Sequence, residues 1–216
     1  MSLARCTRCF AAAAAVALVG LVVPTASGAI VTFTDRTAWA VAAGANGTIE
    51  TEGFEGLPIG TLAVGDNQLG LVRLNIQLLG TTTTTGASIT NSSPITGTRE
   101  LNVNADEGFR KYTVTFAGNI FSFGFDYTGA ATGGIATLLA GGQTFTFGNL
   151  TTSGNGFFGI VSDVPLSEVG FGDTSPGAFP TEIFDSDNYS FVLVPEPTTA
   201  AALALIAATT LRRRTA

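Results

Sequence analysis

The chain has 216 residues and a formal net charge of −6, and it contains no histidine. This length suits one domain with appended segments, and a hydrophobic content of 45% argues against a wholly disordered chain. Without histidine, the chain lacks the usual acid–base group at neutral pH and the commonest metal ligand. The acidic balance argues against a nucleic-acid-binding protein, because such a protein presents a basic face to phosphate.

Residues 1–29 have the three parts of a secretory signal peptide. Two arginines precede an apolar run from Phe10 to Val23, and small residues close the segment. We predict cleavage by signal peptidase after Ala29, with Gly28 as the second position. The alternative is a membrane helix that stays attached, but the apolar run has 14 residues and a span needs about 20.

Cleavage would remove both cysteines of the chain. Cys6 and Cys9 precede the apolar run, so the mature protein would contain no thiol and no disulfide. Their Cys-x-x-Cys spacing also occurs in metal and redox sites, but no predicted element of a fold surrounds it here. The exported domain must therefore be stable through the packing of its core, with or without a bound cation.

The C-terminal segment combines three features. A Pro-Glu-Pro triplet, an uncharged apolar run and an arginine cluster follow one another: Pro195, Glu196, Pro197; residues 198–211; Arg212, Arg213, Arg214. As a helix, the apolar run would be about 21 Å long at about 1.5 Å per residue, which is short of a hydrocarbon core of about 30 Å. The arginines would hold this end in the cytoplasm.

This tail resembles the PEP-CTERM sorting signal of exported proteins in bacteria that make extracellular polysaccharide. The resemblance implies that exosortase, a membrane cysteine transpeptidase, recognises the triplet. It also implies that the apolar run is a transient membrane anchor, that the arginines stop translocation, and that the protein reaches the cell surface or the extracellular matrix. The run is rich in Ala and Thr rather than Leu, so it would sit in lipid less firmly. The alternative is an unprocessed tail anchor.

Residues 30–194 form the predicted exported domain, with 15 acidic and 5 basic residues and thus a formal charge of −10. Apolar and polar residues alternate in several runs, among them 112–116 and 121–127, which is typical of half-buried strands. The run 71–79 alternates less cleanly, with Arg73, Asn75 and Gln77 on one side. Roughly ten short strands separated by Gly, Asn, Asp and Ser predict an all-β fold, an antiparallel β-sandwich of the jelly-roll or concanavalin-like type.

Short aromatic and acidic motifs recur through this domain, at residues 53–58, 123–126, 157–163 and 183–191. In this respect the domain is similar to uncharacterised jelly-roll domains of PEP-CTERM proteins, which resemble concanavalin-like and carbohydrate-binding sandwiches. The similarity implies a fold and no activity.

One segment, residues 34–44, is predicted to be a short N-terminal helix. Thr34 or Asp35 can cap its start and Gly44 can end it. Trp39, the only tryptophan, has two possible roles. It can pack the helix onto a sheet, or it can stand exposed as a platform on which a sugar stacks.

Oxygen-bearing side chains suggest a calcium site as the one candidate metal centre. Calcium takes six to eight oxygen ligands, and Asp187 and Asn188 lie in an acidic stretch directly before the last strand. Glu55 follows an early strand that can lie beside the last one, and Asp126 is a further candidate. A cation bound there would tie the two ends of the domain together. The alternative is a solvated acidic loop.

No catalytic motif is present. The chain has no histidine for a nucleophilic triad, no phosphate-binding loop, and no recognisable pair of glycosidase carboxylates. We therefore predict a non-catalytic surface or matrix protein in contact with extracellular polysaccharide. The alternative is a calcium-dependent carbohydrate-binding module or a weak glycosidase.

Overall fold

A computed structural model describes seven stretches of the chain: residues 28–79, 86–91, 95–105, 110–129, 136–147, 155–173 and 182–194. The predicted sorting motif, apolar tail and arginine cluster lie outside these stretches, as does the predicted signal peptide apart from Gly28 and Ala29. Within the described stretches, no helix is both long enough and apolar enough to span a membrane.

The described residues form twelve strands and one helix. In chain order these are β1 (Ile30–Phe33), α1 (Arg36–Gly44), β2 (Ile49–Glu52), β3 (Gly60–Thr61), β4 (Gly65–Leu69), β5 (Val72–Leu78), β6 (Ala87–Thr90), β7 (Glu100–Ala105), β8 (Arg110–Thr128), β9 (Ala136–Ala140), β10 (Gln143–Thr146), β11 (Gly156–Asp173) and β12 (Glu182–Leu193). Every strand pairing among them is antiparallel.

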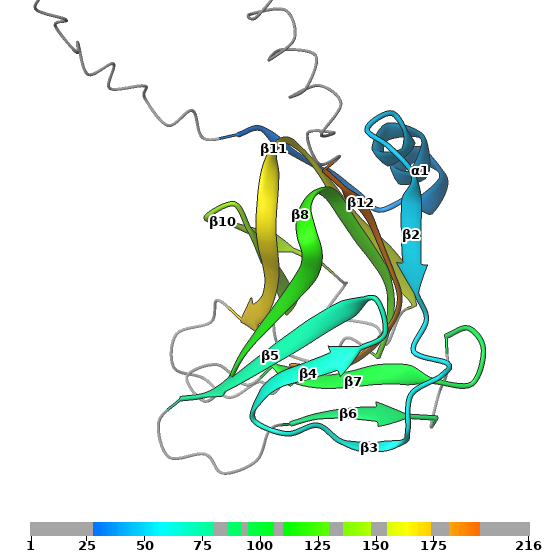
Figure 1. Cartoon of the computed structure of the whole chain (residues 1–216), viewed down its shortest axis with the longest axis vertical. Helices are drawn as coiled ribbons and strands as arrows, with labels where there is room; N and C mark the ends of the chain where they lie inside the picture. The colour runs from blue at the N-terminus through cyan, green and yellow to red at the C-terminus, as the bar shows by residue number, and fades with distance from the viewer. Residues whose placement is uncertain are drawn as a thin grey trace, which may run out of the picture.

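The strands form two packed layers, and the two longest strands run through both of them (Figure 1). The first layer has the order β10-β9-β11-β8-β5-β4, and it uses the C-terminal half of β11 and the N-terminal half of β8. The second layer has the order β1-β11-β8-β12-β7-β6-β3, with β2 also beside β12. The fold is the antiparallel β-sandwich that the alternating pattern predicts.

A bend in β8 and β11 connects the layers. The register between these strands shifts after Val161 and again after Leu166, and the facing residues 117–119 of β8 are exposed. Irregular pairing of this kind bends a strand and increases its twist. The side chains of β8 that alternate inward on each side of the bend, such as Val114 and Phe125, therefore enter the same core.

Aromatic rings fill the space between the layers. Phe125 of the second layer meets Phe147 and Phe171 edge to face, with ring centroids 5.0 Å and 5.3 Å apart. Edge-to-face pairs add to the free energy gained by burying apolar area. The predicted assignment of alternate β8 aromatics to the core is confirmed for Phe123 and Phe125, which are fully buried.

Helix α1 lies on the outer face of the second layer, where Trp39 anchors it. Asp35 caps the helix by accepting a hydrogen bond from the backbone of Ala38 at 2.7 Å. The Trp39 side chain is 1% exposed, and its indole N–H donates to the carbonyl of Ile160 at 3.1 Å. A Cβ at Gly159 would lie 2.5 Å from the indole, so glycine is needed for this close approach. The packing role of Trp39 is confirmed, and the sugar-stacking role is wrong because the ring is buried.

The two ends of the domain meet at the bend. The carbonyl of Ala29 accepts from the backbone N–H of Asp163 at 3.1 Å, and the N–H of Val194 donates to Asn119 at 2.8 Å. Asp163 and Asn119 both belong to the bent parts of β11 and β8. The predicted cleavage site, after Ala29, directly precedes the first residue of β1.

Candidate functional site

The first polar site lies on β12, at the point where the strand paired with one of its edges changes from β7 to β2. On one edge of β12, β7 pairs with residues 182–186 and β2 pairs with residues 189–192. The opposite edge pairs with β8, where Asp187 faces Asp126 and the register then slips by one residue. Asn188 has a φ of 52° at this bulge, a left-handed conformation that asparagine adopts more readily than most residues. Asp187 and Asn188 therefore lie where neither β7 nor β2 reaches.

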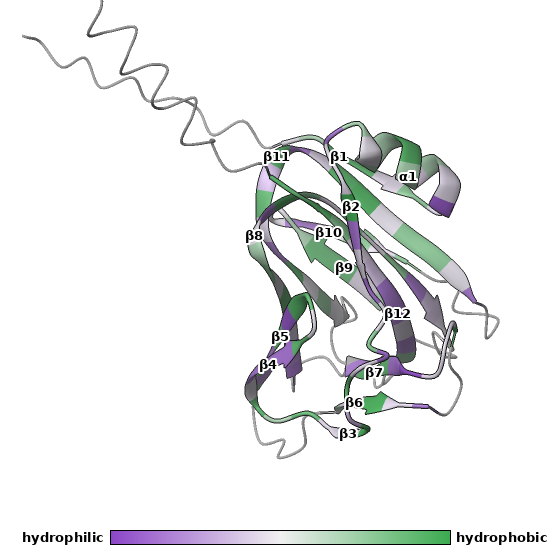
Figure 2. Ribbon diagram, turned by 45° about the vertical axis from the view of Figure 1, so that its right-hand side comes forward, coloured by the Kyte–Doolittle hydropathy of each residue, from purple (hydrophilic) through white to green (hydrophobic). Residues whose placement is uncertain are grey.

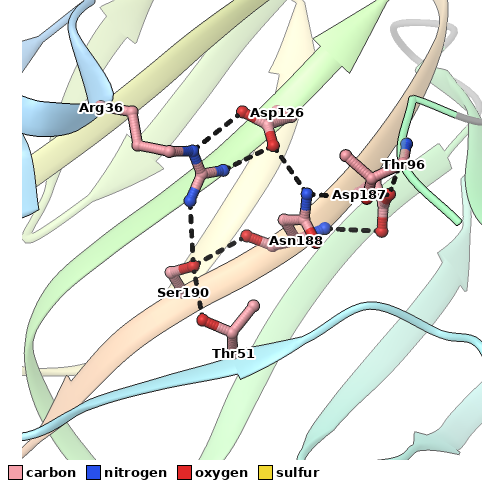
Figure 3. A network of polar contacts seen from close by, with 7 residues as sticks. All are labelled: Arg36, Thr51, Thr96, Asp126, Asp187, Asn188 and Ser190. Atoms are coloured by element: carbon pink, nitrogen blue, oxygen red, sulfur yellow. Dashed lines mark hydrogen bonds and ion pairs between the residues drawn. The ribbon is translucent and has the colours of Figure 1, made fainter.

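Arg36, at the start of α1, joins a hydrogen-bonded network at this position (Figure 3). Its Nη2 lies 2.6 Å from Oδ2 of Asp126, and its Nε donates to Oδ1 at 3.2 Å. Its Nη1 donates to the hydroxyl of Ser190 at 3.4 Å, and its guanidinium carbon lies 4.7 Å from the ring centre of Phe157. The guanidinium thus combines a two-point carboxylate contact with a cation–π contact.

The side chain of Asn188 extends the network to the segment before β7. Its Nδ2 donates to Asp126 at 2.8 Å and to the hydroxyl of Thr96 at 2.9 Å. Thr96 in turn donates to Oδ2 of Asp187 through its hydroxyl at 2.5 Å and its backbone N–H at 3.2 Å. The two facing aspartates are therefore surrounded by protein donors (Figure 3).

Glu55 lies apart from this network and binds the same segment from another side. Its carboxylate accepts from the hydroxyl and N–H of Thr98, at 2.7 Å and 2.8 Å, and from the N–H of Arg99 at 3.2 Å. Asp187 and Glu55 together hold residues 96–99 in place. Of the four residues predicted for a cation site, the structure therefore brings Asp126, Asp187 and Asn188 together and places Glu55 outside their network.

The gathered oxygens do not fit the calcium ion predicted from the sequence. Asn188 directs its amide nitrogen, not its oxygen, at Asp126, and Arg36 already supplies positive charge there. Within the described stretches, no group of three or more Asp, Glu, His or Cys side chains is arranged to hold a metal ion. Sequence reasoning missed Arg36 because its partner Asp126 is 90 residues away. The available signal was a lone arginine at the start of the predicted helix, which could pair with the single acidic residue of a strand.

Burial and hydrogen bonding shift the pKa values of the acidic groups in opposite directions. Burial raises the pKa of Asp187, the hydrogen bonds from Thr96 and Asn188 partly offset this, and the charge of Asp126 raises it further. Burial also raises the pKa of Asp185 on the same strand. The hydrogen bonds from Thr98 lower the pKa of the exposed Glu55 carboxyl.

The second polar site is a hollow of about 330 Å³ on the outer face of the first layer, across β4, β5, β8 and β11. Figure 2 shows the hydrophilic residues of β4 and β5 in purple. The lining residues are Asp66, Arg73, Asn75, Gln77, Lys111, Thr113, Thr115 and Glu168. The sequence signal for this hollow was the polar side of the run 71–79, which points away from the core.

Side-chain length explains why this face is hollow. Three cross-strand pairs of β5 and β8 face outward here. Asn75 and Thr113 form the middle pair, and both have short side chains. Thr113 is 7% exposed, whereas Arg73, Gln77 and Lys111 in the flanking pairs are exposed. Short side chains form the floor and long ones form the rim. Nδ2 of Asn75 donates to Asp66, while its Oδ1 is buried and accepts no hydrogen bond from the described residues.

A second hollow of about 340 Å³ continues the first along the strands. It shares Arg73 and Thr115 with the first and is otherwise lined by Gln68, Leu71, Val72, Phe116 and Ala117. We call the two hollows together the trough. One half of the trough is polar, and the other half is partly apolar.

Comparison with known proteins adds little to this geometry. No family model and no curated protein matches the chain. A solved variant of CBM29-2, a family 29 carbohydrate-binding module in complex with mannohexaose, aligns with a TM-score of 0.38 and 14% identity over 67% of this chain and 90% of that chain. Another variant of the same module gives a TM-score of 0.39 and 12% identity over 67% and 84%. No ligand is carried over from this likeness.

We predict that Asp187→Asn alters how stability depends on pH. Because the pKa of Asp187 is raised in the folded protein, the folded protein binds more protons than the unfolded chain above the unfolded value of about 4. The contribution of Asp187 to the free energy of unfolding therefore falls as the pH rises above that value, until the carboxyl is deprotonated in the folded protein as well. The free energy of unfolding of the wild type, minus that of the variant, should decrease as the pH rises above about 4.

Urea unfolding at a series of pH values measures this difference. Asp66→Asn, on the exposed face of β4, serves as the control for loss of a negative charge. A difference for Asp187→Asn that stays constant or grows with pH would contradict the assignment.

Proposed function

We propose that this chain is an exported, non-catalytic protein of the cell surface or extracellular matrix that binds polysaccharide in the trough. The observation that carries the proposal is the trough floor, where Oδ1 of Asn75 is a buried acceptor to which none of the described residues donates. A buried acceptor is costly when it is left unsatisfied, and a sugar hydroxyl can donate to it.

The composition of the trough suits a carbohydrate. Its polar half carries amide, hydroxyl, carboxylate, guanidinium and ammonium groups, which together donate to and accept from hydroxyls. Its other half includes the side chain of Leu71, which is 48% exposed. Apolar side chains of this kind can contact the C–H faces of sugar rings, while polar groups fix their orientation.

The contacts of the trough carboxylates support binding without hydrolysis. Asp66 is on β4 and Glu168 is on β11, three strand spacings apart. The carboxylate of Asp66 accepts from Asn75 at 2.6 Å and lies 3.7 Å from Nη1 of Arg73, so its neighbours already engage it. A glycosidase needs a pair of carboxyl groups that act together on one glycosidic bond. A weak glycosidase is therefore the less favoured function.

Export rests on the sequence features of the two ends of the chain. The signal-like start, the Pro-Glu-Pro triplet, the apolar run and the arginines support secretion and sorting by exosortase. Ala29 and Val194, near the two ends of the described residues, contact the same bend of β8 and β11. The two residues thus lie at one corner of the sandwich, which suits a domain held on one side of a membrane.

Terminal sequencing of the protein from an expressing bacterium tests export. We expect Ile30 as the first residue and loss of the segment after the Pro-Glu-Pro triplet. Glu196→Ala should retain the tail, whereas the matched control Glu168→Ala should be processed normally. A protein that keeps its signal segment, or that loses its tail regardless of Glu196, would contradict the sorting proposal.

Variants of the trough floor test polysaccharide binding. Affinity electrophoresis of the purified protein through gels containing glucan, mannan, xylan or alginate should show retardation by at least one polymer. Asn75→Ala and Thr113→Val should each weaken that binding about 2- to 10-fold, because each removes one hydrogen-bonding group. Thr144→Val on β10, outside the trough, should leave it unchanged. Retardation by none of the polymers, or equal binding by all variants, would contradict the proposed function.

A further inference from the structure

We infer that the trough selects an uncharged polysaccharide and holds it as an extended chain along β5 and β8. This inference rests on the proposed function and assigns the ligand class to the same site. Its basis is the charge balance of the trough within an acidic domain, and the direction in which the trough runs.

The charged groups of the trough balance one another. The rim carries two acidic residues, Asp66 and Glu168, and two basic ones, Arg73 and Lys111. The rest of the predicted exported domain accounts for its formal charge of −10, from 15 acidic and 5 basic residues. A polyanion would meet the repulsion of the domain without an excess of cations in the trough to offset it. A neutral chain meets no such barrier.

The rim cations are not arranged as a carboxylate trap. Nη1 of Arg73 already lies 3.7 Å from Oδ2 of Asp66. Arg73 pairs with Thr115 and Gln77 pairs with Lys111, four positions further along β5, so the two cations start about 13 Å apart. Single, separated donors of this kind suit hydroxyls, whereas tight binding of a carboxylate uses a bidentate arginine.

Lys111 and Glu168 complete a mixed rim. Glu168 faces Thr115 on β8, four positions from Lys111, which separates their backbones by more than about 13 Å. Neither forms an ion pair within the stretches of chain that the structure describes. Each can therefore bind a hydroxyl, Lys111 as a donor and Glu168 as an acceptor.

The shape of the trough favours a polymer over a single sugar. The trough runs from Leu71 and Ala117 to Gln77 and Lys111. Five residue steps along β5, from Val72 to Gln77, correspond to about 17 Å at about 3.3 Å per residue. A monosaccharide would occupy only part of this length, so affinity should grow with oligosaccharide length until the trough is filled.

Polymers that share a backbone and differ in charge test the inference. Isothermal titration of the full chain should compare hydroxyethyl cellulose with carboxymethyl cellulose, and methyl-esterified with free polygalacturonate, beside neutral mannan and xylan. We expect binding to at least one neutral polymer and binding at least about tenfold weaker to a carboxylated polymer at low salt. This difference in affinity should become smaller at about 1 M salt, where the Debye length is about 3 Å.

A charge reversal in the trough provides the local control. Glu168→Lys should reduce the difference in affinity between neutral and carboxylated polymers. Asp163→Lys makes the same change in net charge outside the trough and should narrow the difference less. If both variants act equally, the rim charges contribute nothing beyond the net charge of the domain, and the assignment of the preference to the trough is overturned.

The outcomes separate the two proposals. Binding of carboxylated polymers as tight as, or tighter than, binding of neutral ones overturns the inference while polysaccharide binding stands. Binding to no polymer overturns the proposed function and the inference together. Equal affinity for a monosaccharide and a hexasaccharide overturns the extended-chain part.

Discussion

The ion pair between Arg36 and Asp126 fixes how the helix meets the sandwich, and several other features depend on it. The guanidinium contacts both carboxylate oxygens and the Phe157 ring, on a sheet face where Asp126 is only 16% exposed. Without this cation, Asp126 would lose its ion-pair partner while it faces Asp187 across β8 and β12. Because Asn188 and Thr96 continue the network, the same ion pair also supports the bulge of β12 and the segment leading into β7.

The position of α1 also determines which surface can receive a ligand. Trp39 and its helix cover the outer face of the second layer, where Gly124 and Gly159 let the indole approach the backbone. The outer face of the first layer carries no such helix among the described residues, and there the polar side chains of β5 and β8 form the trough. The two layers share their long strands, yet one outer face is used for stability and the other is open to solvent.

The sequence predicted the sandwich because alternation along β8 depends only on local order, and it predicted α1 because Asp35 is a local cap. It expected an early strand beside the last one, and β2 does pair with β12, but the carboxylate that follows β2, Glu55, binds Thr98 and not the residues of β12. It could not place Arg36 on Asp126 or Glu55 on Thr98, since those contacts join residues 90 and 43 positions apart. The sequence also could not predict the trough. Its floor forms because the short side chains of Asn75 and Thr113 are paired between longer ones, and this pairing depends on the register of β5 against β8.

A double-mutant cycle tests the role of the ion pair most directly. The free energy of unfolding should be measured in urea for the wild type, Arg36→Met, Asp126→Asn and the double variant. If the pair organises this face, the two substitutions should be non-additive by at least about 1 kcal/mol, as residues in one network are. Additivity within about 0.3–0.5 kcal/mol, the range of independent sites, would show that Trp39 docks the helix without the ion pair and would contradict this account.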